Sequence, residues 1–475
     1  MEFSNSNNMK AAHLDHDESF RDRMPSVTEK GKRNWIYALK PEGKWYTRRG
    51  VLSILYIITF FSLPFIKIQG NPALMFNVVE GRFSILGTIF WPQDFFIFGV
   101  AAVTGVIFIY LFTMIYGRIF CGWACPQTIF MEMIFRKIEW WIEGNPNKQR
   151  ALDKGPWTSE KIIKKGAKHF VFFWMSFIIA NTFLSYIIGY ENLFKIISEP
   201  LREHIGGFIA LVVFTYTFYI VYAFAREIVC TIICPYGRLQ SVLLDGNSIV
   251  VAYDYVRGEP RGKGKRPSEE GLGDCIDCKQ CVVVCPTGID IRNGTQLECI
   301  NCTACIDACN HIMDKVGQPR GLIRYASESE IAENKPFEFS GRMKAYSVVL
   351  LLLVTGLGFL LTTRDDVDVT LMRAKGMLFQ EVGTDSLSNL YQMTMINKTH
   401  KGITVEIKVE NEPGVINFIG HKELVTPAEG QSESTFFIIL PKSVIKERDT
   451  QLKLGIYHNG KLISTKKTSF LGYTE

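Results

Sequence analysis

The sequence predicts a multi-domain fold in which an α-helical membrane bundle of about five transmembrane helices carries a small cysteine-rich insert and an exported all-β C-terminal domain. Five long apolar stretches predict the bundle, since a spanning helix needs roughly 20 mostly apolar residues. Twelve cysteines lie between Cys121 and Cys309 in short spacings, and the last eight of them predict the insert. Alternating apolar residues toward the C-terminus predict strands.

The composition excludes several classes of protein. Hydrophobic residues make up 47% of the 475 residues, which excludes a disordered, collagenous or small disulfide-stapled chain. The net charge of +6 is too mild to indicate a nucleic-acid partner, and we expect none. Cysteines separated by two or three residues are typical of metal ligands rather than of a disulfide framework.

The five apolar stretches are the candidate spans. They cover Val51–Ile66, Phe95–Tyr116, Phe170–Tyr190, Gly206–Ala225 and Ala345–Thr362. A buried core helix is the alternative for any one of them, but five uncharged stretches in one chain favour a polytopic membrane protein.

The distribution of Lys and Arg predicts the orientation of the spans. Basic residues gather at 30–49 and 118–168, whereas the loops between the first two spans and between the third and fourth hold only two each. We therefore expect the N-terminus and the insert in the cytoplasm and everything after Thr362 outside it. The exported part has no cysteine, which suits an oxidising compartment.

The insert carries two runs of four cysteines. The first reads C-x2-C-x2-C-x3-C-P, and the second repeats the spacing with Asn310 in place of Pro286. In bacterial-type ferredoxins three cysteines of a run bind one 4Fe-4S cluster and the fourth binds the other. We therefore assign Cys275, Cys278, Cys281 and Cys309 to cluster 1, and Cys285, Cys299, Cys302 and Cys305 to cluster 2. Zinc is the alternative, but zinc sites pair two-cysteine knuckles rather than runs of four.

A second cysteine motif, C-x3-C-P, follows both the second and the fourth span. It comprises Cys121 and Cys125 before Pro126, and Cys230 and Cys234 before Pro235. A helix would stack each pair on one face, whereas the proline disfavours helix at the preceding residue and puts the second cysteine on a turn. If the two spans are adjacent, the four thiols converge on a site for Cu(I), zinc or another iron-sulfur centre. The alternative is that they are inert core residues.

Three features beside these motifs have structural interpretations. We expect residues 126–142 to form an amphipathic helix in the membrane interface. We expect Arg118 and Arg226 to anchor their spans among lipid headgroups rather than to activate thiolates. Asp94 opens the second span, where an acid complements the helix dipole, and a quinone or metal role is the alternative.

From about Ser386 the pattern changes to short alternating strands separated by turn signals such as Asn411–Gly414 and His458–Gly460. About ninety residues of such strands predict an immunoglobulin-like (Ig-like) sandwich. The expected organisation is a disordered cytoplasmic tail (1–34), a four-helix membrane domain with the two C-x3-C-P motifs (35–250), a cytoplasmic ferredoxin domain (251–340), a fifth transmembrane helix (341–364) and a periplasmic Ig-like domain (365–475).

With these motifs in this order, the chain resembles the CcoG family of cytochrome c oxidase accessory proteins, also called FixG or RdxA. Residues 91–95, 255–262 and 313–325 look like family signatures. The resemblance implies a multi-pass protein of the bacterial inner membrane that reduces Cu(II) to Cu(I), a metal-ion oxidoreductase supporting copper delivery and assembly of a C-family haem-copper oxidase. It implies two 4Fe-4S clusters on the eight ferredoxin cysteines and copper-facing catalytic thiols at Cys121, Cys125, Cys230 and Cys234. The implied partners are oxidase assembly factors, a copper-transporting ATPase or copper chaperone, and an unidentified cytosolic electron donor.

Two other functions are open. Paired C-x3-C-P motifs also resemble the quinol-oxidising subunits of periplasmic nitrate reductase systems, which would make the chain a quinol-linked membrane ferredoxin. The exported β-domain argues against that function. The third possibility is a non-enzymatic assembly scaffold whose exported domain docks the oxidase and whose clusters are structural.

Overall fold

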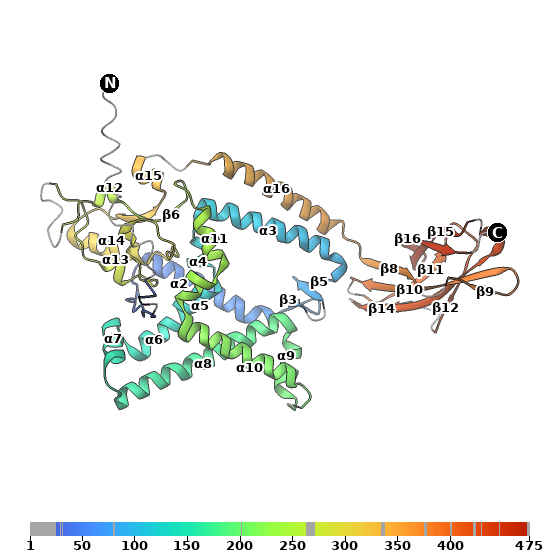
Figure 1. The fold of residues 1–475 in the computed structure, drawn as a ribbon, viewed down its shortest axis with the longest axis horizontal. Helices are drawn as coiled ribbons and strands as arrows, with labels where there is room; N and C mark the ends of the chain where they lie inside the picture. Colours follow the sequence, from blue (N-terminus) through green and yellow to red (C-terminus); the bar gives the residue numbers. More distant parts are fainter. Residues whose placement is uncertain are drawn as a thin grey trace, which may run out of the picture. The chain divides into compact units, whose positions relative to one another are not determined.

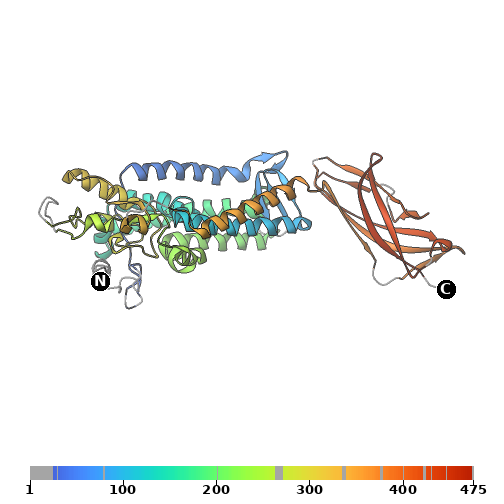
Figure 2. The same cartoon turned by 90° about the horizontal axis from the view of Figure 1, so that it is seen from above.

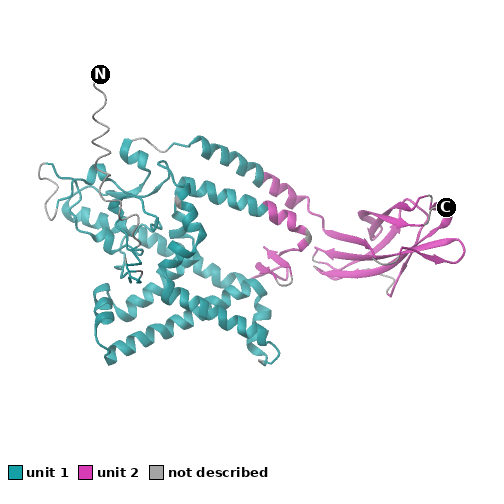
Figure 3. Ribbon diagram, in the orientation of Figure 1, with its two compact units in different colours: residues 1–65, 101–354 teal, residues 66–100, 355–475 magenta. Residues whose placement is uncertain are grey.

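The computed structural model describes residues 25–472 except for 29, 31, 79–80, 201, 263–270, 334–337, 375–377, 400, 421–423, 429 and 446. Most of the predicted N-terminal tail therefore lies outside the described residues. The chain divides into two compact units, Met1–Phe65 with Ala101–Val354 and Ile66–Val100 with Thr355–Glu475 (Figure 3). The first unit holds all twelve cysteines.

Five helices are long and apolar enough to cross a membrane, which confirms the five predicted spans. They are α2 (Lys44–Ser62) with its extension η2 (Leu63–Phe65), α3 (Phe95–Tyr116), α8 (Ser159–Ile188), α10 (Ile205–Ile220) with its π-helical extension η5 (Val221–Ala225), and α16 (Gly341–Thr362). The third begins well before its apolar stretch, because the Thr158 side chain caps it by accepting from the Lys161 amide.

Aromatic side chains pack the helices of the first unit together. α8 and α10 lie side by side (Figures 1 and 2), with the rings of Phe183 and Phe214 stacked at 6.0 Å between their centroids. A segment of α5 (Pro126–Phe130), η4 (Met131–Phe135) and α6 (Arg136–Glu143) fills the space beside them. Phe135 is fully buried and stacks on Tyr222 at 4.4 Å. The prediction of an interfacial helix is therefore wrong over most of this segment, because its apolar side chains belong to the bundle core.

Shorter helices connect the spans. They are α4 (Ile119–Trp123), α7 (Pro146–Lys154), α9 (Tyr190–Ser198), η6 (Val229–Ile233) and α11 (Pro235–Leu243). Two of them, α4 and η6, carry the first cysteine of each C-x3-C-P motif.

The ferredoxin insert is built around a two-stranded antiparallel sheet, in which Val250 pairs with Ala326 and Tyr253 with Ile323. Its elements are β6 (Val250–Tyr253), α12 (Tyr255–Gly258), α13 (Gln280–Val283), η7 (Ile291–Asn293), α14 (Ala304–Val316), β7 (Ile323–Ala326) and α15 (Glu328–Glu333). Its core contains Tyr253, Ile289, Ile306 and Met313 together with cluster cysteines.

The insert is fixed to the first span through Asp307 of α14. Its carboxylate accepts from the backbone amides of Trp45 and Tyr46, at 3.2 and 2.8 Å, and so caps the N-terminus of α2. Gly43 precedes α2 with φ 153°, and a Cβ there would overlap the Asp307 side chain. Only glycine lets the carboxylate approach so closely.

The second unit contains the C-terminal β-domain, in which two antiparallel sheets enclose one core, as the Ig-like prediction requires. One sheet has the order β12-β14-β10-β8, with β9 also paired to β10, and the other β13-β11-β15-β16. The strands are β8 (Val367–Arg373), β9 (Gln380–Val382), β10 (Ser386–Asn397), β11 (Ile403–Val409), β12 (Val415–Phe418), β13 (Leu424–Thr426), β14 (Gln431–Pro441), β15 (Asp449–His458) and β16 (Lys461–Leu471). The short helix η8 (Lys442–Val444) follows β14.

The loop between the first two spans belongs to the second unit as well. It forms β1 (Lys67–Ile68) with β2 (Asn71–Pro72), a three-stranded sheet of β3 (Leu74–Asn77), β4 (Arg82–Ile85) and β5 (Thr88–Phe90), and the turn η3 (Pro92–Asp94). The buried Asp94 carboxylate pairs with Arg364 at 2.7 Å and Lys398 at 2.6 Å. The carboxylate therefore holds two cations together inside this unit.

Candidate iron-sulfur and thiol site

The cysteines of the insert fall into two groups that draw on both runs. Cys285, Cys299, Cys302 and Cys305 line one cavity together with Cys281. Burial raises the pKa of Cys305 well above its usual value, and the nearby thiols of Cys302, Cys299 and Cys285 add to the effect. These four cysteines are the ligand set predicted for cluster 2.

The other group matches the set predicted for cluster 1. Burial raises the pKa of Cys309 to about 12, and the thiols of Cys281, Cys275 and Cys278 raise it further because they lie close by. Of the twelve cysteines, all of which the structure describes, Cys278 is the exposed one. This ligand set is therefore the one that reaches the surface.

The backbone around both sets suits an anionic cluster. In the first run Asp277 and Lys279 adopt left-handed φ angles of 54° and 56°, and the equivalent Asn301 and Thr303 of the second run adopt 51° and 66°. Alternation of left-handed and ordinary residues turns successive N–H groups inward and forms an anion-binding nest. The donor set of four thiols with such a nest fits a 4Fe-4S cluster in each group.

A single zinc ion fits less well. Tetrahedral zinc with Zn–S bonds of about 2.3 Å brings its thiolates within about 4 Å of one another. Among the described residues, the metal-ligand atoms of three or more side chains lie within 4.8 Å of one another only at Glu199, Glu203 and His204. The thiols of the insert are thus spaced more widely than one ion requires.

The two C-x3-C-P motifs have the same local structure. Cys125 and Cys234 lie in extended backbone, at φ −66°, ψ 124° and φ −71°, ψ 114°, and each directly precedes a helix that begins with proline. Proline is favoured at the first helical position because no partner for its missing N–H is needed there. The second cysteine of each motif is therefore on a turn, as the proline indicated, and not stacked on a helix.

The structure brings the four thiols of these motifs together. Burial raises the pKa of Cys230 to about 12, and the nearby thiols of Cys125, Cys121 and Cys234 contribute to the rise. Burial likewise raises the pKa of Cys121 to about 11. Its thiol donates to Gln240 Oε1 at 3.3 Å. We call these four side chains the thiol quartet.

The thiol quartet lies against cluster 2. Cys121 packs in one apolar group with Ile300 and Cys302, and Cys305 borders the same group. The close approach depends on Gly122, where a Cβ would overlap the carbonyl oxygen of Ile300. The Trp123 indole donates to the carbonyl oxygen of Asn301 at 3.2 Å and holds this contact in register.

The prediction that Arg118 and Arg226 anchor spans in headgroups is wrong, because both side chains are buried in protein. Arg118 donates to the carbonyl oxygens of Leu297 in the insert and Gly237 in α11. Arg226 has a left-handed φ of 50° and donates to both carboxylate oxygens of Glu139, each at 3.1 Å. A basic residue at the end of an apolar stretch has the same sequence pattern whether it faces lipid or protein. The sequence therefore could not distinguish a headgroup anchor from an arginine buried in protein.

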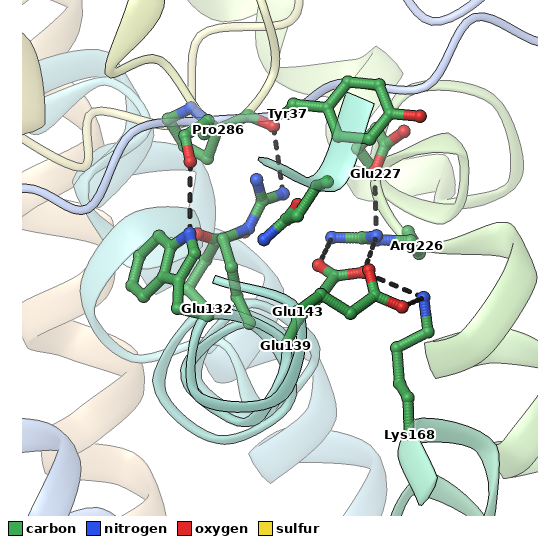
Figure 4. A network of polar contacts seen from close by, with 12 residues as sticks. Tyr37, Glu132, Glu139, Glu143, Lys168, Arg226, Glu227 and Pro286 are labelled. Atoms are coloured by element: carbon green, nitrogen blue, oxygen red, sulfur yellow. Dashed lines mark hydrogen bonds and ion pairs between the residues drawn. The ribbon is translucent and has the colours of Figure 1, made fainter. Parts of the chain in front are cut away.

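Figure 4 shows the buried network around Arg226, which sequence reasoning missed. Glu139 lies between Arg226 and Lys168, and Glu143 accepts from Lys168 at 2.8 Å. Burial would raise the pKa of Glu139, but Arg226 and Lys168 outweigh it and lower the pKa to about 2. Arg136 and Glu139, two of the charged residues in the segment predicted to lie in the membrane interface, are thus paired inside the bundle.

Family models match three parts of the chain. Residues 98–148 match a 4Fe-4S binding domain, residues 225–328 a 4Fe-4S dicluster domain, and residues 357–473 the IG-like fold at the C-terminal of FixG. The fold and the site define a membrane-bound iron-sulfur electron-transfer protein, an oxidoreductase with an all-β C-terminal domain.

Three curated relatives show which family within this class the chain belongs to. Nitrogen fixation protein FixG of Rhizobium meliloti is 31% identical over 80% of each chain. Protein RdxA of Cereibacter sphaeroides is 34% identical over 78% of this chain and 80% of its own, and Protein RdxB of the same organism is 31% identical over 86% and 90%. The chain belongs to the FixG/RdxA family.

Proposed function

We propose that this protein is a membrane cupric reductase, which converts Cu(II) to Cu(I) during copper delivery to a C-family haem-copper oxidase. The observation that carries the proposal is the contact between the thiol quartet and cluster 2, through Cys121 and Cys302. Thiolates are soft ligands that prefer Cu(I) over Cu(II), so the quartet would retain the reduced ion.

The reaction is the gain of one electron by Cu(II). Two 4Fe-4S clusters on the eight ferredoxin cysteines would supply one-electron transfer from a cytosolic donor. Cys278, the exposed cysteine, would offer this donor a surface approach, and Cys121 would hold the copper substrate beside Cys302.

The proposal also includes the compartments in which the domains lie and the partner proteins. The insert lies in the cytoplasm and the Ig-like domain in the periplasm, as the distribution of basic residues predicts. An oxidase assembly factor and a copper-transporting ATPase or copper chaperone are the proposed partners. The C-terminal domain, which shows no cysteine, would serve docking rather than redox chemistry.

The test is anaerobic Cu(II) reduction by pre-reduced protein, read with a Cu(I)-specific chelator beside the cluster absorbance. Wild type is compared with the serine variant at all four quartet positions and with the two double variants, C121S/C125S and C230S/C234S. We expect stoichiometric Cu(I) from wild type and little from the quadruple variant at equal cluster content. Equal reduction by both would overturn the proposal and direct attention to quinol oxidation.

A further inference from the structure

Two buried arginines flank cluster 2. Arg49 of α2 is 2% exposed and donates through Nε to the carbonyl oxygen of Gly122 at 2.7 Å. Arg118 is 5% exposed and donates to the carbonyl oxygens of Leu297 and Gly237. Their direct partners are backbone carbonyls, which hold the guanidinium groups in place without neutralising them.

Both charges reach ligands of cluster 2. Gly122, whose carbonyl oxygen accepts from Arg49, packs so closely on the carbonyl of Ile300, two residues before the ligand Cys302, that a Cβ would overlap it. Leu297, whose carbonyl oxygen accepts from Arg118, lies two residues before the ligand Cys299, and the other acceptor, Gly237, lies three residues after Cys234 of the quartet. Arg118 therefore lies between cluster 2 and the thiol quartet.

Neither arginine is paired with a carboxylate. In the described part of the chain, neither Arg49 nor Arg118 forms an ion pair within 4.0 Å. The acid near Arg118 is Glu298, which forms no ion pair with it. The acid near Arg49 is Glu132, which pairs with Arg136 at 3.1 Å.

The arginines near cluster 1, in contrast, are paired with carboxylates. Arg292, which affects the thiol of Cys281, pairs with Asp277 and Asp290, each at 2.6 Å. Arg257, which affects Cys309, pairs with Asp274 at 2.5 Å. Each arginine beside cluster 1 is therefore compensated by at least one carboxylate.

We propose that Arg49 and Arg118 raise the reduction potential of cluster 2 selectively, so that an electron entering at cluster 1 comes to rest beside the thiol quartet. Reduction adds one negative charge to a cluster, and burial of cluster 2 opposes that addition. Fixed positive charges in a site of low dielectric offset the opposition. The direction of electron flow rests on the proposed delivery of electrons to the quartet. The two arginines act on cluster 2 through their positive charge and not as ligands.

The test is a redox titration of the anaerobically purified protein, followed by electron paramagnetic resonance and done without copper. We compare wild type with R118Q, R49Q and the charge-retaining R118K, at equal iron content. The matched control is R292Q, which removes a buried arginine beside cluster 1. We expect R118Q and R49Q to lower one midpoint potential, R118K to stay near wild type, and R292Q to lower the other midpoint.

Three outcomes would overturn the inference. They are unchanged midpoints in both R118Q and R49Q, equal shifts of both clusters, and a shift in R118K as large as in R118Q, which would assign the effect to hydrogen bonding rather than charge. Because no copper is present, these outcomes are independent of whether the quartet reduces it. A failure of copper reduction with the expected potentials would refute the proposed function alone.

Discussion

Replacing Glu139 by Gln should destabilise the first unit strongly. The substitution keeps the shape of the side chain but removes the charge that Arg226 and Lys168 share. A pKa lowered from 4.5 to about 2 corresponds to about 3 kcal/mol of stabilisation of the carboxylate. Removal of one partner from a buried ion pair costs about 3 to 5 kcal/mol, which agrees. Because the folded-state pKa is depressed, this stabilisation is present above about pH 4.5 and is lost as the pH falls toward 2.

The assay is thermal unfolding of the detergent-solubilised protein at pH 7, where we expect E139Q to unfold several degrees below wild type. E160Q is the control, since Glu160 pairs with Lys164 on an exposed face of α8. The double variant E139Q/R226Q should lose less than the sum of the single variants, because it leaves one orphaned cation fewer. A melting temperature of E139Q equal to that of wild type would refute the reasoning.

The remaining predictions concern three other contacts. D94N leaves Arg364 and Lys398 without their shared anion, so the second unit should become more susceptible to proteolysis; resistance equal to wild type would contradict the structural role of Asp94. G122A should separate α4 from the insert and slow electron transfer from the clusters to copper in stopped-flow measurements, whereas G105A, which adds a Cβ with nothing within 4 Å, should not. C278S should lower the iron content by the four irons of cluster 1 and leave the electron paramagnetic resonance signal of cluster 2. Loss of both cluster signals would show that the two clusters assemble only together.

The five spans, the 4Fe-4S motifs and the β-domain could be predicted because each depends on a local and repetitive pattern. A run such as Cys275 to Cys285 specifies its own loop, and alternation in Ile403–Val409 specifies which face of the strand is buried. The crossing of the fourth cysteine between runs follows from the same repeat. These features require no knowledge of which segments are neighbours.

The burial of 126–143 and of Arg118 and Arg226 could not be predicted in that way. A segment with charges on one side and apolar residues on the other is equally compatible with a membrane surface and with a core that contains its own counterions. The counterion of Arg226 is Glu139, and the acceptor of Arg118 is the Leu297 carbonyl, 179 residues away. Such pairings become visible only when distant elements are placed in space.

The cap on the first span has a consequence for biogenesis. Trp45 and Tyr46 emerge early in translation, yet the carboxylate that receives their amides, on Asp307, lies 262 and 261 residues further along the chain. The N-terminal end of the first membrane helix therefore stays uncapped until the insert has been synthesised and docked. Since Asp307 sits between Cys305 and Cys309 on α14, loading of the cofactors and completion of the bundle converge on one short helix. A chain that never acquires its metal would thus expose a frayed helix end to membrane proteases.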